Sequence, residues 1–442
     1  MSILTDHQAT LLSGLFKAVP DAVVARLEIA LANEAEKGGS MASVHGLIAN
    51  EAADRRVRTA VFGPVSALCG AGVGARFPRR LIAQLWDALR ITQLELAIAA
   101  EGAWSRGQDD QITPADIYNR LCAHAREGLA DQVPAFDAAH ATLEQAGDGI
   151  AQDFNAFLDL IPLGRQAMTR LPDWIGRLNE EKSAAARIAY KDAVALSDDA
   201  GPRLFDMMLA NLAQPWMILR VMSAVMDRPV DTFVAGSELA RFGEFVLDDV
   251  DQRLEQFRKF DPDHGREAGI DASELLHVAA QEIAEFETSI ELRKDGPWGR
   301  RVVKQRQALA EMAEQRYRQV DKALDQALPL QMVRFGKGMR GQPKLVADPD
   351  HRLVRRAEGL LGFYDHTRAY ASQFGFGASR AKLGEAMQSR LEHYVEDLLE
   401  LLRADELSDM DRVRAYLAIA ADFIGDASGE QAAQIVRRRA AA

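Results

Sequence analysis

The chain has 442 residues, of which 48% are hydrophobic and 27% charged, and its formal net charge is −12. This length allows two or three domains with large apolar cores, and the acidic balance argues against a nucleic-acid footprint covering the whole protein. Aromatic residues make up only 7%, while alanine, leucine, arginine and glutamate are abundant, a mixture that favours helices over strands. We therefore predict an all-α protein made of multi-helix bundle domains.

The cysteines and the amino terminus indicate the compartment. Cys69 and Cys122 are too few for a disulfide framework, so we expect free thiols in a reducing environment. The first 20 residues carry Asp6 and have no basic segment, unlike a secretory signal. No apolar run reaches the about 18 residues of a membrane span. These features predict a cytoplasmic protein that makes no membrane contact.

The first half of the chain reads as a series of amphipathic helices. We expect uninterrupted helices over 79–104 and 173–197, and a further long helix over 231–260. Residues 202–226 are the most apolar segment, which predicts a buried helix that Pro215 kinks or divides. The run of turn residues at 198–202 marks the strongest boundary. It divides the chain into an N-terminal helical domain, 1–200, and a C-terminal helical domain, 201–442.

Residues 272–328 predict two long helices that fold back on each other across the breaker at 295–299. In the first arm the apolar residues recur at steps of four and three: Leu276, Ala279, Ile283, Phe286 and Ile290. In the second arm they recur at sevens: Val303, Ala310, Tyr317 and Leu324. Both spacings place apolar side chains on one helix face. We predict a long antiparallel αα-hairpin with a coiled-coil-like seam.

The two arms of this hairpin carry opposite charges. Residues 271–291 contain six carboxylates and no lysine or arginine, whereas 293–306 contain six cations and a single aspartate. Because the link is short, carboxylates before the turn are expected to face cations after it. The predicted carboxylates are Glu287 and Glu291, and the predicted cations are Arg300, Arg301 and Lys304.

A second distinctive stretch, 329–349, reads as a loop rich in glycine and proline, and cations gather in and after it. They are Arg334, Lys337, Arg340, Lys344, Arg352, Arg355 and Arg356. Only Asp348 and Asp350 oppose these seven cations, a local reversal of the acidic balance. The pattern predicts an anion-binding site for RNA, a phosphorylated ligand or an acidic partner. The alternative is a loop that neutralises nearby carboxylates, such as those of 271–291.

One pair of residues has the spacing of metal ligands. Glu274 and His277 form an E-x-x-H pattern, which places both side chains on one helix face. A di-iron bundle needs a second such pair, for which His393 and Glu396 are the candidates, and the alternative is an ordinary solvated face. Motifs for zinc, for a phosphate loop or for a dinucleotide are absent, so we predict no cofactor.

These observations support three functional hypotheses. The leading one is a non-enzymatic helical scaffold or partner-binding protein, forming a homodimer, because long amphipathic helices and a coiled-coil-like hairpin are typical of such proteins. The first alternative is an anion-binding or nucleic-acid-binding protein that uses Arg334 to Arg356. The second alternative is a helical-bundle enzyme that depends on a metal.

Overall fold

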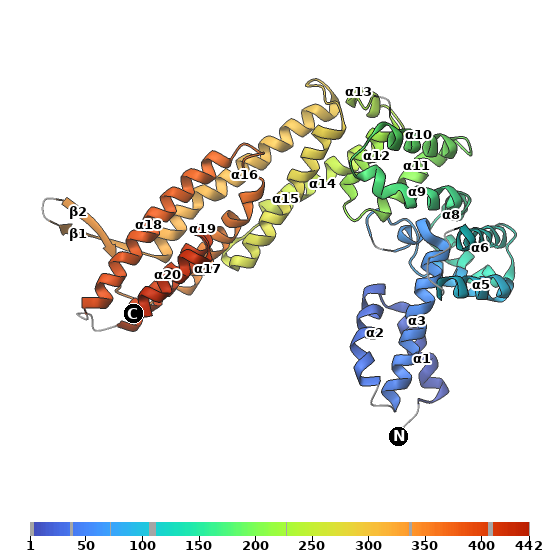
Figure 1. The fold of residues 1–442 in the computed structure, drawn as a ribbon, viewed down its shortest axis with the longest axis horizontal. Coiled ribbons are helices and arrows are strands. Elements are labelled where there is room, and N and C mark those ends of the chain that lie inside the picture. The colour runs from blue at the N-terminus through green and yellow to red at the C-terminus, as the bar shows by residue number, and fades with distance from the viewer. Residues whose placement is uncertain are drawn as a thin grey trace. The chain divides into compact units, whose positions relative to one another are not determined.

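The computed structural model describes residues 4–35, 39–70, 72–105, 112–226, 228–335, 338–404 and 410–441 (Figure 1). These residues form 20 α-helices and one small two-stranded sheet, which confirms the prediction of an all-α protein. The chain divides into two compact units, Met1–Asp227 (unit 1) and Arg228–Ala442 (unit 2). Among the described helices, none combines the length and the apolar character that a membrane span requires.

In its described residues, unit 1 is built from α-helices and three 3-10 helices. Its α-helices are α1 Asp6–Ala18, α2 Asp21–Ala35, α3 Ser40–Phe62, α4 Leu81–Thr92, α5 Leu94–Ser105, α6 Ile112–Ala130, α7 Asp137–Ala146, α8 Ile150–Asp159, α9 Ile161–Ile175, α10 Glu180–Val194, α11 Ala200–Asn211 and α12 Ile218–Val225. Its 3-10 helices are η1 Gly63–Leu68, η2 Pro134–Phe136 and η3 Pro215–Met217. The helices α1 and α2 both pack on α3, around a core formed by Phe16, Val24, Ile48 and Ala52.

Three predicted helices are shorter than expected, because local residues end them. Residues 79–104 divide into α4 and α5 at Gln93, whose φ of −135° and ψ of 49° are not helical. Residues 173–197 contain the end of α9 and then α10, which starts where the Asn179 side chain accepts a hydrogen bond from the Lys182 amide at 2.8 Å. Residues 231–260 likewise divide into two helices of unit 2. The predicted division at Pro215 is confirmed, since Pro215 begins η3 between α11 and α12.

The turn residues at 198–202, where we predicted the domain boundary, lie inside unit 1. They start α11, which packs against α9, α10 and η1. Asp, Gly and Pro mark helix starts as readily as domain boundaries, so their presence does not show which elements pack together. The division between the two units follows α12 instead.

Unit 2 is a bundle of long helices with one β-ribbon. Its α-helices are α13 Asp231–Val234, α14 Ala240–Arg258, α15 Arg266–Ser289, α16 Pro297–Ala327, α17 His351–His366, α18 Gly377–Ala404, α19 Met410–Ser428 and α20 Glu430–Ala441. Its 3-10 helices are η4 Pro262–His264 and η5 Thr367–Ala369, and its strands are β1 Leu330–Phe335 and β2 Gly338–Pro343. The helix α15 packs against α14, α16 and α17.

The predicted αα-hairpin is α15 and α16, which Figure 1 shows side by side and antiparallel. The five predicted apolar residues of the first arm are all buried. In α16 the seven-residue pattern holds near the carboxyl end, where Tyr317 and Leu324 are buried, but Val303 is 52% exposed. A straight helix has 3.6 residues per turn and drifts away from a seven-residue repeat, so Val302 and Leu309 take the buried face instead.

The charges of the two arms pair differently from the prediction. Glu287 pairs with Arg306, with 2.8 Å between Oε2 and Nη1. Arg301 turns away from α15 and pairs with Glu244, Asp248 and Asp251 of α14. Because α16 has acidic neighbours on α14 as well as α15, its cations divide between two helices, which the hairpin alone does not reveal.

The segment predicted as a loop at 329–349 contains a regular β-ribbon. The strands β1 and β2 pair antiparallel, with Leu330 opposite Pro343 and Arg334 opposite Met339. Figure 1 shows the ribbon next to α18 and extending away from the helices of unit 2. Met332 and Met339 are 62% and 61% exposed on it. The glycines suggested a loop, but Gly338 and Gly341 lie within β2.

Candidate functional site

The predicted anion-binding residues fall on separate elements of unit 2. Arg334 and Arg340 lie on the ribbon, Lys344 follows it, and Arg352, Arg355 and Arg356 lie on α17, whereas Lys337 lies outside the described residues. Arg340 pairs with Asp397 of α18. Arg352 and Arg356 both pair with Asp263 of η4, at 3.1 Å and 2.6 Å, and their hydrogen bonds lower the pKa of Asp263.

Half of the described cations in this set are therefore held by carboxylates, although not by those of 271–291. Arg334 and Lys344 are exposed, and the Arg355 side chain packs beside the backbone of Gly265. Nothing in these contacts draws the cations into one cluster.

The predicted metal ligands Glu274 and His277 lie near each other on α15, and His277 also contacts Tyr370. The distance from His277 Nδ1 to Glu274 Oε2 is 3.6 Å. The His277 ring stacks on Tyr370, with ring centroids 5.3 Å apart and planes 4° from parallel. Glu396, from the proposed second pair, is bound by Arg439. Across the described ranges, no group of three or more His, Cys, Asp or Glu residues is placed to hold a metal ion.

An open cleft of about 1600 Å³ lies in unit 1 between α2 and α3 on one side and α5, α6 and α9 on the other. Its walls are mostly small or apolar residues, with two aromatic side chains, Trp104 and Tyr118. The charged residues that line it are Asp21, Glu28, Arg55, Arg56, Asp116 and Arg165. This cleft is the candidate functional site.

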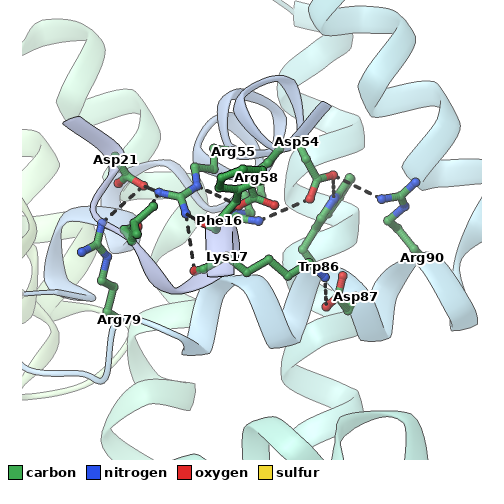
Figure 2. Close-up of polar contacts among 12 residues, drawn as sticks. Phe16, Lys17, Asp21, Asp54, Arg55, Arg58, Arg79, Trp86, Asp87 and Arg90 are labelled. Atoms are coloured by element: carbon green, nitrogen blue, oxygen red, sulfur yellow. Dashed lines mark hydrogen bonds and ion pairs between the residues drawn. The ribbon is translucent and has the colours of Figure 1, made fainter. Parts of the chain in front are cut away.

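A buried ionic network fixes the α2 and α3 side of the cleft (Figure 2). Arg55 is 7% exposed and donates to Glu51 Oε1 at 2.7 Å and to the Phe16 and Val19 carbonyl oxygens at 2.7 and 3.0 Å. It also pairs with Asp21 at the start of α2. One guanidinium of α3 thus holds both the end of α1 and the start of α2.

The same network reaches α4. Arg58 donates to Glu51 and Asp54, and Asp54 also accepts hydrogen bonds from Trp86 at 2.7 Å and from Arg90 at 3.2 Å. A buried charge is tolerated only when its partners satisfy it, so these groups can occupy few other arrangements. The cleft wall is therefore rigidly connected to the core of unit 1.

Arg165 of α9 forms the other side of the cleft. It reaches back to the carboxyl end of α3, where Nη1 donates to the Ala60 carbonyl at 2.8 Å and Nη2 to that of Val61 at 2.7 Å. Its Nε donates to Asn119 Oδ1 at 3.2 Å. Gly63 makes this approach possible, because its φ is +42° and a Cβ there would lie 3.0 Å from Arg165 Nη1.

The charge of Arg165 has no carboxylate partner within the described ranges. The ionisable groups that act on its pKa are Cys122 and Tyr118, and burial lowers that pKa overall. Burial raises the pKa of Cys122 to about 12 and also raises the pKa of Tyr118. Both groups are therefore neutral near pH 7. By contrast, Arg56 makes two hydrogen bonds to Glu28, at 2.9 and 3.1 Å.

Sequence reasoning did not single out the cleft or Arg165. The lining residues come from segments more than 100 positions apart, and Arg165 is one arginine among many on amphipathic helices. The only local signal was Gly63-Pro64, which predicts the end of a helix. It does not predict that Arg165 binds the carbonyl groups at that end. Comparison of this chain with family models, with curated proteins and with solved structures finds no match.

Proposed function

We propose that this chain is a helical partner-binding protein, and that the cleft of unit 1 receives an α-helix of the partner. The observation that carries the proposal is the size of the cleft. Small-molecule sites usually have volumes of about 300–1,000 Å³. At about 1600 Å³ the cleft exceeds this range, which favours a segment of protein, such as a helix about 10–12 Å across, as its occupant.

The lining supports a helical occupant. Ala25, Ala52, Ala60 and Ala103 are among the residues on its walls, and such short side chains allow a further helix axis to approach closely. The apolar walls suit the apolar stripe of an amphipathic helix, which is a common mode of peptide recognition. The network around Arg55 holds the wall in place before binding, which lowers the entropic cost of association.

The test is site-specific photo-crosslinking in cells that express the full chain. A photoreactive amino acid replaces Thr169, which lines the cleft, and in the control it replaces the neighbouring Arg170, which does not. We expect a crosslink from position 169 only, to one amphipathic helical segment identified by mass spectrometry. The substitution Ala25→Trp, at an exposed position of the lining, should remove it by filling the cleft.

Equal crosslinking from positions 169 and 170, or a crosslink that survives Ala25→Trp, contradicts the proposal. A crosslink to a second copy of the chain identifies the partner as the chain itself and makes the protein a homo-oligomer through this cleft.

A further inference from the structure

Arg165 carries an incompletely used hydrogen-bonding group at the edge of the cleft. A guanidinium has five N–H donors. Three of them point at Asn119, Ala60 and Val61, which leaves two without an acceptor in the described part of the chain. The guanidinium also lies over the Tyr118 ring, 5.3 Å from its centroid, so that one of its faces is covered.

The other cations of the cleft are already engaged with carboxylates. Arg55 is held by Glu51 and Asp21, and Arg56 by Glu28. Arg165 is therefore the lining cation whose charge no carboxylate of the described residues balances. In a half-buried position such a charge attracts an anion more strongly than it would in open water.

We infer that the partner's helix places an aspartate or glutamate carboxylate on the Arg165 guanidinium. This inference rests on the cleft being the docking site, and it adds the chemistry by which the partner is selected. A carboxylate can accept hydrogen bonds from the remaining N–H groups, and such charge-assisted hydrogen bonds are short and directional. The apolar stripe of the same helix then lies along the alanine-lined walls.

The competing explanation is that Arg165 only stabilises the fold. It caps the carboxyl end of α3, where carbonyl groups carry a partial negative charge that favours a cation. A purely structural role predicts that changing Arg165 weakens every ligand of the cleft equally. Recognition of a carboxylate predicts a loss that depends on the charge of the ligand.

The experiment selects helical peptides against the full-length protein. The probe is a displayed library of 16-residue amphipathic helices with randomised positions on and beside the apolar face. Some selected peptides should bind the wild type but not the Ala25→Trp variant. We expect these peptides to be enriched in aspartate or glutamate at one position. A selected peptide should bind the wild type at least tenfold more tightly than its counterpart with glutamine at that position, as measured by fluorescence anisotropy.

The variant Arg165→Gln keeps amide donors for the α3 carbonyl groups but removes the charge. We expect it to bind the two peptides within twofold of each other, whereas Arg165→Lys retains a preference for the acidic one. Equal affinity of the wild type for both peptides overturns the inference without needing any variant to fold. The inference is also overturned if Arg165→Gln weakens binding of the acidic peptide and of its glutamine counterpart by the same factor.

Failure of the inference and failure of the proposed function give different results. Helices that bind in the cleft without an acidic preference reject only the role of Arg165. If no helix binds in a way that Ala25→Trp blocks, the docking site itself is rejected. Binding of octanoate in preference to octanamide, together with no helix binding, assigns the site to a free carboxylate ligand and rejects the helical partner.

Discussion

Glu282 is a carboxyl group that folding removes from water. It is 1% exposed on α15, and Arg253 of α14 donates to its Oε1 at 3.3 Å. Burial above all, and then the neighbouring Asp249 carboxylate, raise the pKa of Glu282 to about 9, although Arg253 acts in the opposite direction. Glu282 therefore keeps its proton in the folded protein at neutral pH, and the protonated group can donate to Asp249.

This raised pKa makes the stability of unit 2 depend on pH. In the unfolded chain Glu282 titrates near its ordinary pKa of 4.5, so between about 4.5 and 9 the folded state binds a proton that the unfolded state has released. The free energy of unfolding therefore falls as pH rises through this range, and the loss is complete above the folded pKa. At pH 5 most of this loss of stability has not yet occurred.

We predict that Glu282→Gln, which resembles the protonated acid, stabilises unit 2 by about 1–3 kcal/mol at pH 8 and much less at pH 5. Urea denaturation at both pH values measures the difference. The control is Glu287→Gln on the same helix, whose side chain is 38% exposed and paired with Arg306. It should change stability by about 1 kcal/mol or less at either pH. An equal effect of Glu282→Gln at both pH values contradicts the assignment.

At the scale of elements, the crossing of α15 and α17 depends on glycine. A Cβ on Gly269 would lie 1.9 Å from the Gly359 carbonyl oxygen and 2.8 Å from the Phe363 amide nitrogen. Both neighbours are backbone atoms of α17, so no side-chain rotation can relieve the contact. The two helices can approach this closely only because the position has no side chain.

We predict that Gly269→Ala destabilises unit 2 by about 3 kcal/mol or more, the upper range for overpacking, in chemical denaturation. The matched control is Gly425→Ala in α19, where the new methyl group meets the Ala433 Cβ at an ordinary 3.5 Å. Because alanine favours helix over glycine, the control should be neutral or stabilising by about 0.5–1 kcal/mol. Similar losses in the two variants would show that the α15–α17 crossing is not tight.

The elements also show what a sequence can predict. The α15 stripe from Leu276 to Ile290 was predictable, because the period of apolar residues within one helix is a local property. The exposure of Val303 was not predictable in this way, because the buried face of a straight helix drifts relative to a seven-residue repeat. The partners of Arg301 and the approach of Arg165 to α3 depend on which helices become neighbours. Tertiary packing decides which helices become neighbours, and a short-range sequence pattern does not predict it.

At the scale of the whole molecule, each unit has a core of its own. In unit 1, Phe62, Leu85 and Trp86 are fully buried, and in unit 2, Phe286, Phe363 and Leu391 are. A group of residues that buries its own apolar surface can unfold as one cooperative unit. Substitutions that weaken one core should therefore change the protection of that unit.

We predict that Arg55→Met, which leaves Glu51 and Asp21 without one partner, destabilises unit 1 by about 3 kcal/mol and leaves unit 2 unchanged. Hydrogen exchange measured by mass spectrometry in increasing urea resolves this, because each peptide reports on its own unit. Peptides from residues 4–105 should lose protection at lower urea, while those from 228–335 keep the wild-type midpoint. The neighbouring Arg56→Met removes a pair that is half exposed, so it should cost about 1 kcal/mol or less. Equal shifts in the urea midpoints of both units in Arg55→Met would mean that the two cores unfold together. A shift in unit 1 alone would show that the Arg55 network stabilises the cleft wall and unit 1 only.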